Sequence, residues 1–148
     1  MSNANRFNSI KYIGRLSEFL VDVVETELTK SGFESLSATH FEILTYLIRK
    51  KIPVNMTRIA EAIHRKKPTV TILVNKLENL NLVQKEISSE DKREFMISLT
   101  KKGKSFRKVA LKISSKVFSL KLWGVEPDES EKLFQLLEKV YHHTRIKI

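Results

Sequence analysis

Residues 68–80 combine an apolar face with a face of small polar side chains. Four apolar residues recur there at three- and four-residue spacing, which predicts a helix with one buried face: Val70, Leu73, Val74 and Leu77. The residues expected mostly on the other side are Thr69, Thr71, Ile72, Asn75, Lys76 and Asn79. Hydroxyl and amide groups can hydrogen-bond to base edges, Ile72 can pack on a thymine methyl, and Lys76 can reach a phosphate or a guanine. An ordinary solvated helix face is the alternative interpretation.

The segment just before this helix is basic. Arg65, Lys66 and Lys67 precede Pro68, a residue that suits the first turn of a helix. Free backbone N–H groups at a helix N-terminus attract phosphate, and neighbouring cations strengthen that attraction. We therefore expect these three side chains to contact a nucleic-acid backbone.

A polar turn at residues 88–93 carries a second set of charged side chains. Arg93 is a long cation at the base of this loop and is suited to a narrow, electronegative minor groove. Asp91 is placed to hold its guanidinium by charge-assisted hydrogen bonds, and Lys92 can add a phosphate contact. Such a triplet is common in surface loops and predicts nothing alone. Asp91-Lys92-Arg93 supports nucleic-acid binding because it follows the helix with the polar face.

Patterns for catalysis or metal binding are weak. The sequence has no Gly-rich phosphate loop, no His-Glu-x-x-His and no nucleophile elbow, so we expect no enzymatic activity and no cofactor. His142 and His143 are neighbours, which point about 100° apart on a helix and chelate poorly. His40 with Glu25 or Glu42 is conceivable as a zinc site, but no spacing is compelling, and we expect no metal.

The remaining patterns supply the elements that must position these residues. An apolar stripe in residues 8–30 predicts a long helix, and Ser37 and Asn55 can cap two further helices. Two strand-like stretches, Leu82–Ile87 and Glu94–Leu99, flank the polar turn as a hairpin, and Asn81 can end the helix before it. Thr100 can cap a helix running to about Leu122, and a last helix covers roughly 128–144 with Leu133, Leu136, Leu137 and Val140 buried.

Charge is concentrated in the middle of the chain. Residues 49–116 hold 18 Lys and Arg against six acids, whereas the formal net charge of the whole chain is +10. Such a segment favours a polyanionic partner, although basic surfaces also serve solubility. The absence of cysteine excludes disulfides and thiol redox sensing, and no apolar run is long enough for a membrane span. We expect a cytoplasmic protein without a membrane partner.

Several of these stretches together resemble the MarR family of bacterial winged helix-turn-helix regulators. Ile59-Ala60-Glu61-Ala62-Ile63 is similar to the family's first DNA-binding helix, and Pro68 through Glu78 to its recognition helix. Asp91-Lys92-Arg93 matches the Asp-x-Arg wing motif, and Leu99-Thr100-Lys101-Lys102-Gly103 matches its Leu-Thr-x-x-Gly. Asn81 replaces a frequent Gly, Gln84-Lys85 stand where an Arg is frequent, and Lys67 replaces a small residue.

The resemblance implies a homodimer, formed by the terminal helices, that binds a near-palindromic operator in double-stranded DNA. It also implies release by a small aromatic or anionic ligand held between the dimer layer and the DNA-binding lobe. The residues expected to line that site are Tyr12, Arg15, His40 and Tyr46, although simple packing is the alternative for each.

The predicted fold is mainly α, a winged helix-turn-helix of about six helices plus a two-stranded wing, with a helical dimerisation layer. Residues 1–36 are expected to form an N-terminal dimerisation helix, 37–100 the DNA-binding lobe, and 101–148 the C-terminal dimerisation helices. The function expected is transcriptional regulation, by repression or activation. A non-specific DNA- or RNA-coating protein and a protein-interaction module that has lost nucleic-acid binding are the alternatives.

Overall fold

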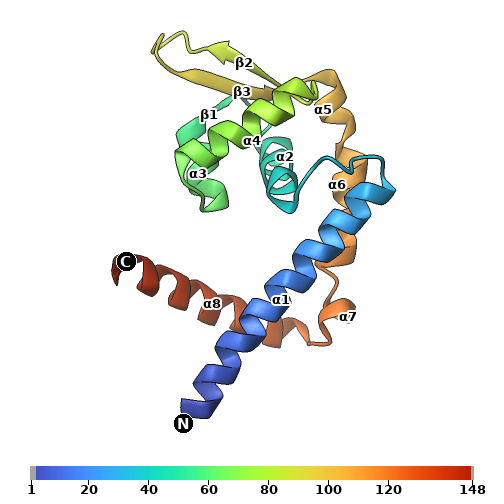
Figure 1. Cartoon of the computed structure of the whole chain (residues 1–148), viewed down its shortest axis with the longest axis vertical. Coiled ribbons are helices and arrows are strands. Elements are labelled where there is room, and N and C mark those ends of the chain that lie inside the picture. The colour runs from blue at the N-terminus through green and yellow to red at the C-terminus, as the bar shows by residue number, and fades with distance from the viewer. Residues whose placement is uncertain (1–2, 148) are drawn as a thin grey trace. The chain divides into compact units, whose positions relative to one another are not determined.

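The computed structural model describes residues 3–147, so the outermost residues of the predicted segments 1–36 and 101–148 lie outside the described residues. The described chain consists of α1 (Asn3–Lys30), α2 (Ala38–Lys50), β1 (Val54–Asn55), α3 (Met56–Ile63), α4 (Lys67–Asn79), β2 (Val83–Ile87), β3 (Phe95–Leu99), α5 (Lys101–Ser105), α6 (Arg107–Val117), α7 (Leu120–Trp123) and α8 (Pro127–Lys147) (Figure 1). It forms two compact units, Met1–Ile113 and Ser114–Ile148. None of the described helices is long and apolar enough to span a membrane.

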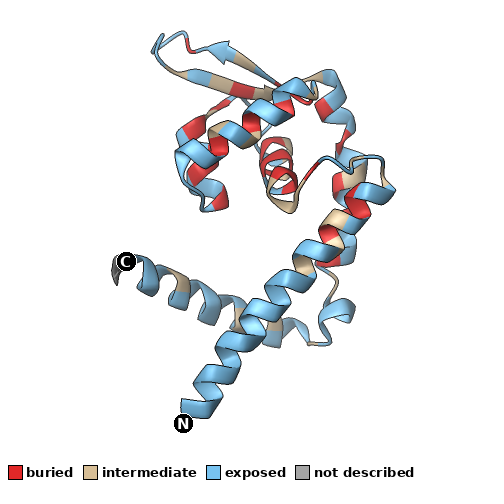
Figure 2. Ribbon diagram, in the orientation of Figure 1, coloured by how far each residue is buried: buried red, intermediate tan, exposed pale blue. Residues whose placement is uncertain are grey.

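The first unit contains the winged helix-turn-helix fold that the sequence predicted, together with α1, α5 and most of α6. Its core comes from α2, α3, α4 and the base of the hairpin (Figure 2). The side chains of Ile43, Leu44, Ile59, Val70, Val74, Leu77 and Ile97 are completely buried there. Phe106 lies edge-on to Phe33, with ring centroids 5.0 Å apart, and packs against Phe41 as well.

The sheet has one strand more than the sequence predicted. The strand order is β1-β3-β2, with both pairs antiparallel, and the hairpin register places Val83 opposite Leu99 and Ile87 opposite Phe95. β1 is only two residues long and pairs Val54 with Ile97. Because two residues carry no periodicity, the sequence showed only that Pro53 ends one helix and Asn55 begins the next.

Side-chain caps fix where α2 and α3 begin, and both were predicted. The Ser37 hydroxyl accepts a hydrogen bond from the His40 backbone N–H, and His40 Nδ1 accepts one from the Ser37 backbone N–H at 3.0 Å. This reciprocal arrangement is a capping box in which imidazole replaces the usual Glu or Gln. Asn55 Oδ1 accepts from the Arg58 N–H at 2.8 Å and begins α3.

Two predictions for the C-terminal part were wrong. The helix expected from Thr100 to Leu122 is divided into α5, α6 and α7, and Phe106 occupies the break between the first two. The four residues expected to be buried on the last helix are intermediate or exposed in the single chain: Leu133, Leu136, Leu137 and Val140. Periodicity identified an apolar stripe correctly but did not reveal what would cover it.

A close approach between α5 and the start of β2 fixes the base of the hairpin. A Cβ added to Gly103 would lie 1.9 Å from the Leu82 carbonyl oxygen, so only glycine fits. The same carbonyl accepts from the Thr100 N–H at 3.1 Å, and the Thr100 hydroxyl donates to the Asn81 carbonyl at 2.6 Å. Asn81 adopts a left-handed φ of 60° directly after α4, as its residue type predicted.

We expect Gly103→Ala to lower the free energy of unfolding by about 1–3 kcal/mol or more, because the new methyl group meets a backbone oxygen that cannot move aside. This clash outweighs the better helix propensity of alanine, which is worth about 1 kcal/mol. Urea denaturation followed by circular dichroism measures the difference. Lys101→Ala, at an exposed position of the same helix, is the control and should change stability by less than about 0.5 kcal/mol. Equal stability of the two variants would contradict this account.

The buried imidazole of His40 makes stability depend on pH. The ring is 4% exposed, and burial, followed by the nearby Lys76 ammonium, lowers its pKa below the ordinary value of 6.5. The unfolded chain therefore binds more protons in the interval below pH 6.5, and the contribution of neutral His40 is lost as the pH falls through that interval. Protonation would also remove the lone pair on Nδ1 that completes the capping box.

We expect His40→Gln to be less sensitive to acid than the parent protein, since glutamine can keep the capping box without carrying a proton. Melting temperatures of both proteins measured from pH 7.5 to 5 provide the comparison. The parent should lose stability relative to the variant below about pH 6.5. Parallel curves over the whole range would show that His40 has no such role.

Candidate nucleic-acid interface

Helix α4 presents one face to the core and the other to solvent. Val70, Val74 and Leu77 are buried, whereas Ile72 is 71% exposed and Thr69 is exposed as well. Pro68 lies in the first turn of the helix, where its fixed φ is favourable and its missing N–H costs no hydrogen bond. The face that the sequence predicted to be outward is therefore outward, with Thr71 half-buried at its edge.

Three polar side chains of this face already bind partners within the chain. The Thr71 hydroxyl donates to the Lys67 carbonyl at 3.0 Å, which leaves its oxygen as an acceptor. Asn75 Oδ1 accepts a hydrogen bond from Lys85 Nζ. Lys76 Nζ donates to the Ser35 carbonyl, so its ammonium is held at the loop between α1 and α2. Sequence periodicity placed these residues on the surface but did not reveal these bonds.

The N-terminus of α4 is open to an anion. Its N-cap residue, Lys66, has extended backbone and makes no side-chain capping hydrogen bond. The first-turn N–H groups therefore lack the side-chain acceptor that usually satisfies them. Arg65, Lys66 and Lys67 are all exposed around this end, and His64 ends α3 with a left-handed φ of 54°. Positive charge and unsatisfied donors thus coincide, which is the arrangement that holds a phosphate.

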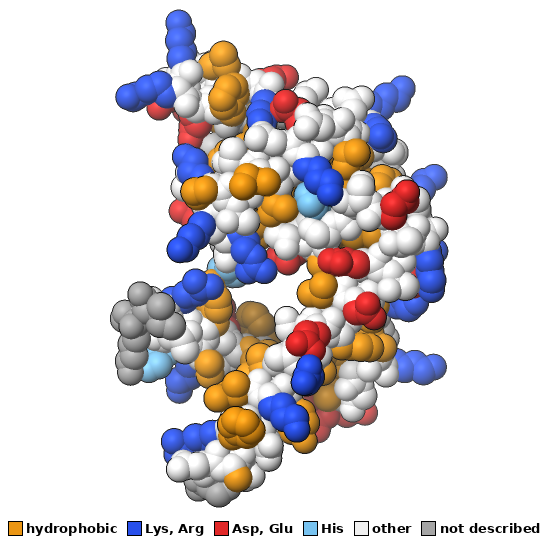
Figure 3. Space-filling model, viewed as in Figure 1, with side chains coloured by type: hydrophobic (Ala, Val, Ile, Leu, Met, Phe, Trp, Pro, Cys, Tyr) orange, Lys and Arg blue, Asp and Glu red, His pale blue; other side chains and the backbone are white. Residues whose placement is uncertain are grey.

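Local hydrogen bonds organise the tip of the hairpin. The Ser88 hydroxyl accepts from the backbone N–H groups of Glu90 and Asp91, at 3.2 and 3.3 Å. Asp91 Oδ1 then accepts from the Arg93 backbone N–H at 3.0 Å and lies 3.4 Å from Arg93 Nε. The pairing of Asp91 with Arg93 is thus present, and it leaves the Arg93 side chain 93% exposed. Lys92 is exposed beside it, and Lys and Arg side chains project from the hairpin tip (Figure 3).

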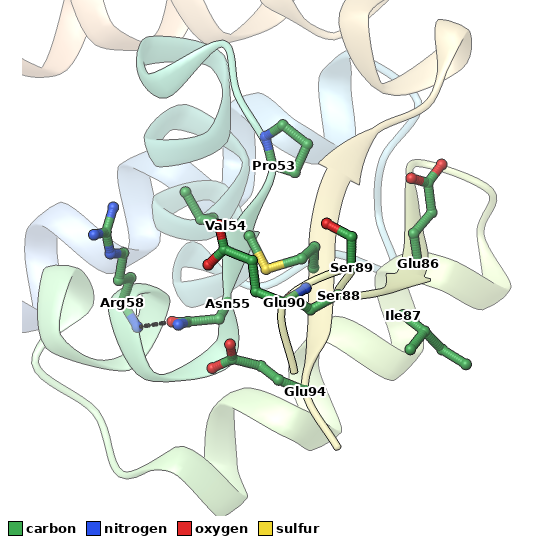
Figure 4. A pocket seen from close by; sticks show the side chains of 11 residues that line it. Pro53, Val54, Asn55, Arg58, Glu86, Ile87, Ser88, Ser89, Glu90 and Glu94 are labelled. Carbon is green, nitrogen blue, oxygen red and sulfur yellow. Dashed lines mark hydrogen bonds between the residues drawn. The ribbon is translucent and has the colours of Figure 1, made fainter. Parts of the chain in front are cut away.

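The two faces of the hairpin differ in charge. Val83 and Lys85 lie on the face toward α4, opposite Leu99 and Ile97, and the pairing ends near the tip with Ile87 opposite Phe95, both of which are exposed. On the other face an open pocket of about 520 Å³ lies between the hairpin, β1 and the start of α3 (Figure 4). Its lining includes the carboxylates of Glu86, Glu90 and Glu94 and a single guanidinium, that of Arg58. This acidic face would repel phosphate, so a polyanion is favoured only at the tip and on the α4 side.

The four residues expected to line a ligand site are not brought together in an open pocket by the described contacts. Tyr12 is 65% exposed on α1, and Arg15 forms an exposed ion pair with Glu18 at 2.9 Å. On α2, His40 completes the capping box, and Tyr46 is buried beneath the Lys50 ammonium. His40 Nε2 is a buried nitrogen without a hydrogen-bond partner.

Metal ligands do not cluster. Within the residues that the structure describes, no group of three or more His, Cys, Asp or Glu side chains is arranged to hold a metal ion. His142 lies beside the Tyr141 ring, with centroids 5.4 Å apart.

Sequence reasoning overlooked Lys85 as part of this surface. It lies on β2, donates to Asn75 Oδ1 and is 3.6 Å from Glu78 Oε2, so it joins the hairpin to the exposed face of α4. The alternation of β2 was the available signal, because Lys85 falls between Val83 and Ile87 on the face toward α4.

Comparison with known proteins agrees with this architecture. The model of the MarR family matches residues 36–95, the segment from just before α2 to the first residue of β3. The HTH-type transcriptional regulator MgrA of Staphylococcus aureus is 32% identical over 108 residues, which cover 73% of this chain and 71% of that protein.

Solved structures show the same fold. AbsC, a MarR family transcriptional regulator from Streptomyces coelicolor, superposes with a TM-score of 0.79 at 21% identity, covering 98% of this chain and 97% of AbsC. The MepR–DNA complex of S. aureus gives a TM-score of 0.77 at 20% identity, covering 97% of this chain and 98% of MepR. The family is one of transcriptional regulators and not of enzymes. The chain belongs to the MarR family of winged helix-turn-helix transcriptional regulators.

Proposed function

We propose that this regulator binds a near-palindromic operator as a homodimer, with α4 in the major groove and the hairpin tip, residues 88–93, in the adjacent minor groove. The observation that carries the proposal is the organised tip beside an uncapped, basic helix N-terminus on one lobe. Segment 49–116, which spans both elements, holds 18 Lys and Arg against six acids. MepR, a structural neighbour, is described in complex with DNA.

Within this proposal the exposed residues have separate roles. Thr69 and Ile72 contact base edges in the major groove, and Arg65, Lys66 and Lys67 hold phosphates at the start of α4. Arg93, oriented by Asp91, enters the minor groove, while Lys92 binds the flanking backbone. Thr71 accepts a hydrogen bond at the edge of the reading face. Lys76 acts indirectly, because its ammonium is already bound to the Ser35 carbonyl.

The dimer would form through the terminal helices, with residues 1–36 and 101–148 as the dimerisation segments around the lobe 37–100. Hydrophobic side chains lie exposed along α1 (Figure 3), and α8 carries a further set. The exposed hydrophobic residues include Phe7, Ile10, Ile13, Leu16 and Phe19 on α1, and Phe134, Leu136, Leu137 and Val140 on α8. So much exposed apolar surface is unusual for a free monomer and typical of an interface.

Ligand release is the remaining part of the proposal. A small anionic or aromatic molecule carrying an acceptor would satisfy the buried Nε2 of His40, and Tyr46 lies on the same helix. Arg15 and Tyr12, exposed on α1 and not brought together with His40 in the single chain, would contribute to such a site only in the dimer. Binding at such a place would change operator affinity only if the ligand prefers one conformation of the lobe.

We expect Arg93→Ala to weaken operator binding by about 1–3 kcal/mol while the melting temperature stays unchanged, because the side chain is almost fully exposed. Fluorescence anisotropy provides the affinity, using labelled duplex from upstream of the protein's own gene and random duplex of equal length. Lys139→Ala, which removes one positive charge from an exposed position of α8, is the matched control and should bind like the parent protein. If the parent protein bound the upstream duplex and the random duplex with equal affinity, the result would favour a non-specific DNA-coating role.

Light scattering at micromolar concentration should give a mass of about twice 17.2 kDa. Ile13→Asp should weaken dimerisation by about tenfold or more, because it places a charge in an apolar interface. Ile13 is exposed in the single chain, so the substitution leaves the core of the single chain unchanged. Asn8→Asp adds the same charge to the opposite side of α1 and serves as the control. A parent protein that remains monomeric would rule out the homodimer.

A further inference from the structure

Lys85 connects the hairpin to the exposed face of α4 through two contacts. Its Nζ donates to Asn75 Oδ1 and lies 3.6 Å from Glu78 Oε2. These two acceptors are three residues apart on α4, so they lie on neighbouring positions of one helix face. The Lys85 side chain is only 20% exposed, which is low for a lysine, and its charge is balanced by Glu78. Lys85 is therefore held between strand and helix.

This contact fixes the orientation of the Asn75 amide. A lysine ammonium carries only donors, so the group that faces Lys85 must be the carbonyl oxygen of the amide. The Asn75 NH₂ group consequently points away from Lys85, and Asn75 is itself exposed. An amide without such a neighbour can turn either way.

The orientation limits which bases Asn75 can recognise. Asparagine reads adenine in the major groove with both ends of its amide, accepting from N6–H and donating to N7. Here one lone pair of Oδ1 is taken by Lys85, and the adjacent ammonium repels a second donor such as N6–H. The NH₂ group remains available, and guanine offers it two acceptors, N7 and O6.

We propose that Lys85 is a positioning residue that makes Asn75 a donor-only reader, so that the operator carries guanine rather than adenine at the base Asn75 contacts. The inference rests on the proposed function, because it requires α4 in the major groove. It adds a specificity determinant outside the recognition helix, on the wing strand. Glu78 supports it by keeping the Lys85 ammonium at this place and away from the phosphates.

Selection of bound sites from a randomised duplex pool tests the proposal with the full-length protein. Asn75→Ala first identifies the base position in each half-site whose preference depends on Asn75. At that position the parent protein should prefer guanine. Lys85→Met, which keeps the aliphatic stem and removes the donor, should shift the ratio of guanine to adenine by about tenfold toward adenine. Lys85→Arg retains a donor and should therefore keep the parent's preference for guanine at this position.

A double variant, Asn75→Ala with Lys85→Met, should show no additional change at this position, since Lys85 acts there only through Asn75. If Lys85→Met melts at a lower temperature than the parent protein, Lys85→Ala, which also lacks the donor, is used for the same measurement.

Three results would overturn the inference. They differ in whether they also contradict the proposed function. A uniform loss of affinity in Lys85→Met with an unchanged base preference would make Lys85 a phosphate contact. An Asn75→Ala variant with the parent's preference at every position would mean that Asn75 reads no base, and the proposed function would survive both results. A parent protein that enriches no sequence at all would overturn the operator proposal together with this inference.

Discussion

The position of the hairpin relative to α4 depends on how closely α5 approaches Leu82. Because Gly103 has no side chain, the Leu82 carbonyl can sit where a Cβ would otherwise be, and it accepts the Thr100 N–H there. The Thr100 hydroxyl caps α5 through the Gly103 N–H and also binds the Asn81 carbonyl. The end of α4, both ends of the hairpin and the start of α5 are thereby joined at one point. The contacts of Lys85 with Asn75 and Glu78 on α4 depend on this junction.

Charge then determines how a nucleic acid can approach the lobe. Cations surround the uncapped start of α4 and extend from the hairpin tip, whereas Glu86, Glu90 and Glu94 line the other face of the hairpin. Attraction and repulsion by fixed charges together define an orientation that attraction alone would leave open. Under the proposed binding mode, the acidic pocket would help to orient the lobe without contacting DNA itself.

Periodicity and capping chemistry predicted most of the lobe from sequence. Ser37 and Asn55 begin helices as their side chains suggested. On α4, Val70, Val74 and Leu77 are buried as predicted, whereas Leu73 is only half-buried. Features set by tertiary contacts were not predictable in this way. β1 is too short for a pattern. The hydrogen-bond acceptors of Lys76 and Lys85, the Ser35 carbonyl and Asn75 Oδ1, are 41 and 10 residues away in the chain. The sequence thus predicted which face of α4 is exposed. It did not predict which polar groups on that face form hydrogen bonds within the chain.

The ordered hairpin tip has a thermodynamic consequence. The side chains of Ser88 and Asp91 accept three hydrogen bonds from the backbone N–H groups of Glu90, Asp91 and Arg93. Asp91 also accepts from Arg93 Nε, and the Glu94 N–H closes the turn on the Asp91 carbonyl. The conformational entropy of this loop is therefore given up when the chain folds and not when it meets its partner. Under the proposed binding mode, the exposed side chains of Lys92 and Arg93 would still have to be immobilised, whereas the backbone of the turn would not.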